Sequence, residues 1–196
     1  MSDIKNLTSI ELNELFDIYI SYYKNLKSFC NKNKKKIRYP NFPEELSENI
    51  IKYYIINYES KKCVNAKTGD LCIMFSDLNI KSETGNYPSK VHKKIEVKCF
   101  SSTGPTSFGP TECWDEIYFL DAINFIDNKF KIYKCKLSHD SELWSKIKIN
   151  KTETYYDVCK NKRRPRISFS NLYQQLNEDI KLVYEGDFDK IINVSK

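Results

Sequence analysis

The stretch Ile95-Glu96-Val97-Lys98-Cys99-Phe100 alternates apolar and polar side chains, which is typical of a half-buried β-strand. Side chains two positions apart in a strand point to the same face. Glu96 and Lys98 are therefore expected to project together, while Val97 points to the other face. A carboxylate beside an ammonium group at the end of a buried strand is unusual. This pair is the first candidate in the chain for a chemical site.

Helices and further strands are predicted on both sides of this stretch. Residues 8–29 place apolar side chains near i, i+3, i+4, i+7 spacing, and Thr8 with Glu11 forms a capping box, so a helix is predicted there. A second helix is predicted from Pro43 to Tyr58. The other predicted elements are strands at residues 70–75, 116–122, 129–137 and 180–184 and short helices at 141–148 and 168–175. This order predicts an α/β fold, with one central mixed sheet flanked by helices.

Length, composition and charge fit one soluble domain. The 196 residues, 40% of them hydrophobic and 14% aromatic, can form a real core. The net charge of +6, from 32 basic and 26 acidic residues, favours an anionic partner only modestly. No apolar run approaches the roughly 18 residues that a membrane span needs, and the first residues lack the apolar core of a signal peptide. We therefore expect a soluble intracellular protein with no membrane partner, in the cytoplasm of a microbial or virus-infected cell.

The cysteines and histidines do not form a recognisable metal or catalytic pattern. The seven cysteines are odd in number and contain no Cys-x-x-Cys pair, which argues against a zinc site and against a disulfide framework. His92 and His139 are the only histidines, and neither lies in a nucleophile or metal-ligand motif. The chain also lacks a phosphate-binding Gly-x-x-x-x-Gly-Lys motif, so no nucleotide cofactor is expected.

A second carboxylate can join the pair on the central strand. Asp70 follows a Thr-Gly turn and begins the preceding apolar strand, so a hairpin between the two strands would bring it to Glu96. Carboxylates beside a lysine suit phosphodiester hydrolysis, in which oxygen-liganded Mg²⁺ activates water and neutralises the developing charge. The lysine can stabilise the phosphate charge or orient the water. Glu-x-Lys with an upstream Asp is also common on solvated strands, so the pattern gains weight from its apolar neighbours and from the sequence that follows.

Three stretches resemble the PD-(D/E)xK nuclease superfamily, and within it the small type II restriction endonucleases. The first is Phe42-Pro43-Glu44-Glu45-Leu46-Ser47-Glu48, which leads into a helix and on to Gly69-Asp70-Leu71. The second runs from Ile95 to Ala122 and includes the Ser-Ser-Thr-Gly-Pro loop after the central strand. The third is Arg163-Arg164-Pro165-Arg166-Ile167-Ser168-Phe169. Together these regions span residues 42–190, and the middle block is the most specific.

The resemblance implies a role for each residue of the candidate site. Asp70 and Glu96 would bind the metal, with the Val97 carbonyl completing the inner sphere, and Lys98 would be the catalytic lysine. Glu48 resembles the helix glutamate that many members place near the metals. The cofactor would be Mg²⁺, for which Mn²⁺ can substitute.

The chain departs from the superfamily pattern in two ways. Gly69 replaces the proline that usually precedes the first aspartate, although this proline is the loosest part of the signature. The gap between Asp70 and Glu96 is also longer than in compact members, and Asp77 and Glu83 lie within it as rival carboxylates.

Two segments are predicted to contact DNA. The loop from residue 101 to 111 is rich in small hydroxyls and glycine, which allow close approach to phosphates or base edges; otherwise it is a surface turn. The basic run at residues 160–166 can read guanine or clamp phosphate, or it is a solvated patch. Residues 31–38 are a weaker candidate for phosphate steering. The residues assigned to DNA binding are Ser101, Ser102, Thr103, Ser107, Arg163, Arg164 and Arg166.

The sequence and the resemblance together predict a Mg²⁺-dependent type II restriction endonuclease that cuts double-stranded DNA at a palindrome of about 4–5 bp, as a homodimer. A low-specificity or repair nuclease of the same fold is the first alternative, and a non-catalytic DNA-binding module is the second. The chain is expected to be one nuclease domain over residues 1–196. Its parts would be an N-terminal helix and basic loop at 1–40, a catalytic core at 42–140 and a DNA-binding part at 141–196.

Overall fold

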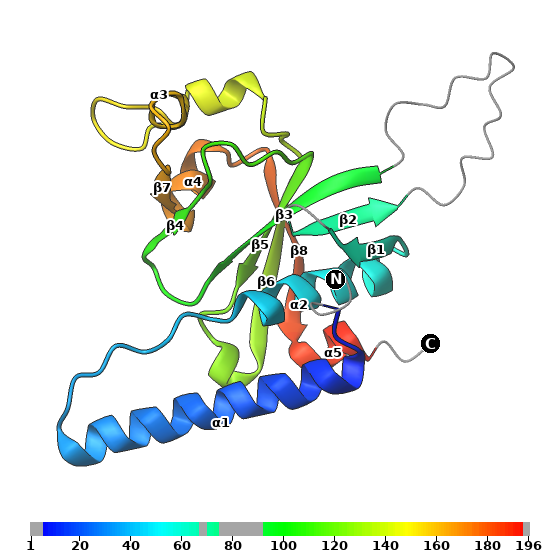
Figure 1. The fold of residues 1–196 in the computed structure, drawn as a ribbon, viewed down its shortest axis with the longest axis vertical. Helices are drawn as coiled ribbons and strands as arrows, with labels where there is room; N and C mark the ends of the chain where they lie inside the picture. The colour runs from blue at the N-terminus through cyan, green and yellow to red at the C-terminus, as the bar shows by residue number, and fades with distance from the viewer. Residues whose placement is uncertain (1–5, 67–69, 75–91, 194–196) are drawn as a thin grey trace, which may run out of the picture.

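The computed structural model describes residues 6–66, 70–74 and 92–193 and shows a mixed α/β fold (Figure 1). Its main sheet has the strand order β1-β2-β3-β5-β6-β8, in which β3 and β5 are parallel and the other neighbours are antiparallel. The strands are β1 Lys62–Asn65, β2 Leu71–Met74, β3 His92–Phe100, β5 Glu116–Asp121, β6 Lys129–Cys135 and β8 Ile180–Asp187. A two-stranded ribbon pairs β4 Pro105–Ser107 with β7 Arg166–Ser168. The predicted central mixed sheet flanked by helices is confirmed.

Two layers of helices cover the two faces of the sheet (Figure 1). One face packs against α1 Ser9–Asn33, α2 Glu44–Tyr58 and α5 Phe188–Ile192, and the other against α3 Tyr155–Lys160 and α4 Phe169–Gln175. The 3₁₀ turns are η1 Phe125–Asp127 and η2 Glu142–Ser145. No helix among the described residues is long and apolar enough to cross a membrane.

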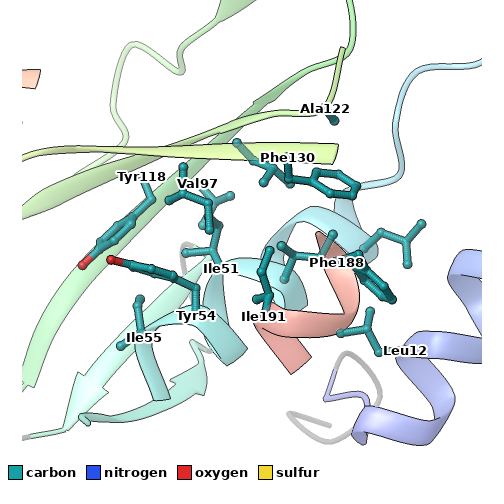
Figure 2. Packing of buried hydrophobic residues seen from close by; sticks show 14 of the residues in the cluster. Leu12, Ile51, Tyr54, Ile55, Val97, Tyr118, Ala122, Phe130, Phe188 and Ile191 are labelled. Atoms are coloured by element: carbon teal, nitrogen blue, oxygen red, sulfur yellow. The ribbon is translucent and has the colours of Figure 1, made fainter. Parts of the chain in front are cut away.

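Alternation along the central strands separates the two cores. On β5, Tyr118 belongs to the core under α2, whereas Phe119 belongs to the core under α3 and α4. On β3, Ile95 and Val97 join the α2 core, and Figure 2 shows Val97 pointing into it beside Ile51. The period of two therefore sends Glu96 and Lys98 toward the other face.

Most predicted elements are present, with altered ends. The first helix continues to Asn33 and ends at Lys34, which adopts a left-handed conformation with φ 52°. The predicted Thr8–Glu11 capping box is present, and the Glu11 N–H donates to Thr8 Oγ1 at 3.2 Å. The helix expected at residues 141–148 is only the 3₁₀ turn η2. The structure adds β1, α3, α5 and the β4–β7 ribbon, which are too short for periodicity to indicate.

A buried ionic network joins the end of α2 to the sheet. The Glu59 carboxylate accepts hydrogen bonds from the Tyr118 hydroxyl at 2.6 Å and from Lys134 Nζ at 2.8 and 2.9 Å. Lys134 Nζ also lies 3.4 Å from Glu116 Oε2. Burial alone would raise the pKa of Glu59, but Lys134, Lys61 and Tyr118 together hold it at about 2, below its ordinary 4.5.

Glu59→Gln is expected to lower the free energy of unfolding at pH 7 by about 1–2 kcal/mol, because Lys134 loses the closer of its two counter-charges while Glu116 remains 3.4 Å away. The folded-state pKa of Glu59 lies below its unfolded value. Its contribution is therefore complete above about pH 4.5 and is lost as the pH falls toward 2. Urea unfolding of both proteins at pH 7 and pH 3 should show a smaller difference at pH 3. An equal difference at the two pH values would contradict this assignment.

Candidate active site

The hairpin of β2 and β3 brings Asp70 to the middle of the central strand. The two strands are antiparallel with Leu71 opposite Ile95, so the residue before β2 arrives beside Glu96. The backbone N–H of Val97 donates to Asp70 Oδ2 at 2.6 Å. This hydrogen bond fixes the Asp70 carboxylate next to Glu96, as the predicted hairpin requires.

Lys98 forms ion pairs with two carboxylates. Its ammonium contacts Glu96 Oε1 directly and lies 3.3 Å from Glu112 Oε2. The side chains of Lys98 and Glu96 are only 12% and 6% exposed, so solvent screens this pair weakly. The Lys98 Nζ also lies 5.3 Å from the centre of the Phe108 ring. Glu96 and Lys98 therefore share one face of β3, as the alternation predicts.

The pKa values of Asp70, Glu96 and Lys98 are all raised in this largely buried site. Burial and the nearby charge of Asp70 raise the pKa of Glu96 to about 8. Burial and the charges of Glu44 and Glu112 raise the pKa of Asp70, and together they outweigh the Val97 hydrogen bond and the Lys98 charge. The pKa of Lys98 is raised despite its burial, because the Glu96 and Glu112 carboxylates stabilise the ammonium. Three carboxylates, those of Asp70, Glu96 and Glu112, crowd around one ammonium, and a bound cation would favour their ionised forms.

The donor set fits a hard divalent cation. Among the described residues, no three His, Cys, Asp or Glu side chains gather closely enough to hold a metal by themselves. Mg²⁺ is usually held by one or two carboxylates and keeps several waters, so Asp70 and Glu96 are a sufficient pair of side chains. Oxygen from the backbone and from water would complete the sphere. The rival carboxylates Asp77 and Glu83 lie outside the described residues.

Two glutamates of α2 bear on the site. The charge of Glu44 raises the pKa of Asp70, and Glu44 lines the same groove as Lys98. Glu48, the glutamate that the resemblance selects, lies one turn further along α2 and is 2% exposed. The role of Glu48 near the metal stays a prediction.

A groove of about 460 Å³ opens beside Lys98. The start of α2, the end of β3 and the β4–β7 ribbon form its walls. Of the residues assigned to DNA binding, Ser101, Ser102, Ser107 and Arg166 line it. Arg38, from the basic run after α1, lines it as well. The groove therefore combines hydroxyls and two arginines with the aromatic residues Phe42 and Phe100, beside Lys98.

The other three residues that are predicted to bind DNA are not among those that line the groove. Arg163 forms an ion pair with Glu153. Arg164 and Thr103 are exposed and are not among the residues that line the groove. Of the three arginines in this run, Arg166 lines the groove and Arg163 and Arg164 do not.

Glu112 is the residue of the site that sequence reasoning missed. It lies 14 positions after Lys98, outside any strand, and no periodicity links the two. Burial would raise the pKa of Glu112, but the Gly109 N–H and the Lys98 ammonium together hold it below its ordinary value. Only its place within the most specific block of the resemblance pointed to it.

Comparisons with known proteins identify the family of the chain. The model of the Bsp6I restriction endonuclease family matches residues 8–176, which include the whole candidate site. The type II restriction enzyme Bsp6I of Bacillus sp. (strain RFL6) is 29% identical over 140 residues, which cover 70% of this chain and 68% of that enzyme. No solved structure matches the chain significantly. The extent of the family match shows that this chain belongs to the Bsp6I restriction endonuclease family.

Proposed function

We propose that this chain is a type II restriction endonuclease of the PD-(D/E)xK kind, which hydrolyses both strands of DNA at a short site. The observation that carries the proposal is the buried group of Asp70, Glu96 and Lys98. The hairpin fixes Asp70 beside Glu96, and Lys98 contacts Glu96 at the edge of a polar groove. Membership of a restriction endonuclease family supports DNA as the substrate.

In this proposal Asp70, Glu96 and the Val97 carbonyl would hold Mg²⁺, and Mn²⁺ could replace it. The bound cation would supply Lewis acidity, which lowers the pKa of water and neutralises charge on the phosphate. Lys98 would donate to a non-bridging phosphate oxygen or orient the attacking water. The low exposure of the Lys98 and Glu96 side chains strengthens each of these interactions.

The groove would hold the DNA backbone on both sides of the cut. Arg38 and Arg166 come from distant parts of the chain and line the same groove. The hydroxyls of Ser101, Ser102 and Ser107 would contribute neutral hydrogen bonds to phosphates or base edges. Thr103, Arg163 and Arg164 would contact DNA further from the cut.

Arg166→Ala is expected to weaken DNA binding by about 1–3 kcal/mol and to relax one position of the recognition site. Arg163→Ala, in which the lost guanidinium was already paired with Glu153, should weaken binding less. The measurement is the Kd for specific and random duplexes in Ca²⁺. A larger loss from Arg163→Ala would contradict the placement of Arg166. An equal loss on both duplexes would mean that Arg166 contacts phosphate.

We also propose a homodimer that cuts a palindrome of about 4–5 bp, since a two-fold axis in the protein matches that of such a site. Each chain would act as one nuclease domain over residues 1–196, divided as the sequence predicts, in the cytoplasm of its cell.

Digestion of plasmid DNA with Mg²⁺ tests this function. Discrete fragments with a common end sequence are expected. A smear would indicate a low-specificity nuclease of the same fold. A gel shift without cutting in Mg²⁺ or Mn²⁺ would indicate a non-catalytic DNA-binding module.

A further inference from the structure

The Glu112 carboxylate is held by the Gly109 backbone and the Lys98 ammonium, and it also forms a side-chain hydrogen bond with Glu96. The backbone N–H of Gly109 donates to Glu112 Oε2 at 2.7 Å, and the same oxygen lies 3.3 Å from Lys98 Nζ. The Gly109 hydrogen bond is part of a loop whose neighbouring residue, Phe108, is fully buried and bonds through its N–H to the Pro165 carbonyl at 3.0 Å. The Glu112 carboxylate therefore has a fixed position beside Lys98.

The absence of a side chain at residue 109 makes this position possible. A Cβ on Gly109 would lie 2.2 Å from Glu112 Oε1 and 2.3 Å from its Cδ, far inside contact distance. The Glu112 side chain thus packs directly on the Gly109 backbone. The clash would involve the flexible end of a side chain, so a methyl group at Gly109 would move the carboxylate and spare the backbone.

Lys98 needs a second counter-charge for a simple reason. In the structure its ammonium contacts Glu96 Oε1, the carboxylate that is also a proposed metal ligand. If Glu96 binds a divalent cation, its carboxylate would have less negative charge to offer Lys98, and the ammonium would lie near a second positive charge. With its side chain 12% exposed, Lys98 has little water to compensate.

We propose that Glu112 is a positioning residue that holds the Lys98 ammonium beside the groove when Glu96 binds the metal. The inference rests on the proposed function and adds to it a residue outside the Asp-Glu-Lys set. Glu112 acts through Lys98, and Gly109 acts by leaving room for Glu112.

The first measurement is Mn²⁺ affinity by calorimetry on the free protein, which does not depend on cleavage. Glu112→Gln and Gly109→Ala should each weaken Mn²⁺ binding severalfold. Loss of an outer-sphere partner typically costs roughly 10- to 100-fold in metal affinity. Glu178→Gln removes the same charge at an exposed position outside the groove. This control should bind Mn²⁺ like the wild type.

The second measurement is the single-turnover cleavage rate at saturating Mg²⁺, beside DNA affinity in Ca²⁺. Displacing Lys98 by about 1 Å should lower the rate roughly 10- to 100-fold, as misplaced catalytic groups do, while DNA affinity stays unchanged. Glu112→Asp, which keeps the charge, should recover part of the rate. In a Glu112→Ala background, Gly109→Ala should cost nothing further, because its methyl group has nothing left to displace.

Several outcomes would overturn the proposal. One is a folded Glu112→Gln protein with wild-type Mn²⁺ affinity and rate, even if its Tm is lower. Another is a defect in Glu112→Gln that Gly109→Ala does not reproduce, since charge alone would then explain it. If the wild type binds Mn²⁺ but cuts no DNA, the proposed function fails while the affinity comparison still tests Glu112. If the wild type binds no Mn²⁺, both proposals fail.

Discussion

Lys98→Met is expected to abolish DNA cleavage while leaving DNA binding and metal binding in place. The substitution keeps an unbranched side chain in the space between Glu96 and Phe108 but removes the ammonium that contacts Glu96. Loss of one preorganised charge-stabilising donor costs about 10²–10³ in rate, and the loss here should reach the upper end because the site is buried. Removal of the competing ammonium frees Glu96, so Mn²⁺ affinity should be equal to or higher than that of the wild type.

The combination of effects identifies the role of Lys98. Cleavage rate, Kd for DNA in Ca²⁺ and Mn²⁺ affinity should be measured on the same preparation, with circular dichroism as the folding control. Retained cutting by Lys98→Met would refute a catalytic role. Loss of metal binding together with cutting would instead make Lys98 a structural support for the carboxylates.

Asp70→Asn should remove both cleavage and metal binding. An amide oxygen at this position can still accept the Val97 N–H, so the hairpin contact of 2.6 Å can persist while the charge is lost. With only Glu96 left as a charged ligand, Mn²⁺ affinity should fall by roughly 10-fold or more. The cleavage rate should fall by at least about 10³, since both activation of water and charge neutralisation depend on the ion.

Asp77→Asn is the matched comparison for Asp70→Asn. Asp77 is the rival ligand that the sequence left open, and it lies outside the described residues. Asp77→Asn is expected to cut DNA and to bind Mn²⁺ as the wild type does. If Asp77→Asn is inactive and Asp70→Asn is active, the first metal ligand is Asp77 and not Asp70.

Local patterns allowed much of the sheet and of the site to be predicted. The alternation of Ile95 to Phe100 fixes both the strand and the shared face of Glu96 and Lys98, because the period of two is a property of the backbone. Two consecutive strands suggested that a hairpin could bring Asp70 to Glu96. The antiparallel register of β2 and β3 agrees with this arrangement.

Contacts between distant loops could not be predicted in this way. The ion pair of Arg163 with Glu153 and the approach of Glu112 to Lys98 depend on how loops pack on a finished sheet. Three arginines in one short run look equivalent in sequence, yet only Arg166 lies in the ribbon that lines the groove. Neither helical nor strand periodicity carries such information.

The start of α2 gives an intermediate case. The helix itself follows from Pro43 and its apolar face, and the resemblance selects Glu48 as the glutamate near the metal. In the structure the charge of Glu44, one turn earlier, also raises the pKa of Asp70, and the role of Glu48 stays a prediction. Glu44 and Glu48 are four residues apart and therefore lie on the same side of the helix. Their spacing in the sequence cannot show which of them is nearer to the metal.

The most direct test of the central claim is digestion of plasmid DNA by the wild type and by Glu96→Gln, each with Mg²⁺ and with excess EDTA, followed by sequencing of the ends. The wild type with Mg²⁺ is expected to produce discrete fragments that share one short end sequence. EDTA and Glu96→Gln should each prevent cutting while the variant remains folded. Cutting by the wild type in EDTA, or by Glu96→Gln at the wild-type rate, would contradict a metal-dependent nuclease site at Asp70, Glu96 and Lys98.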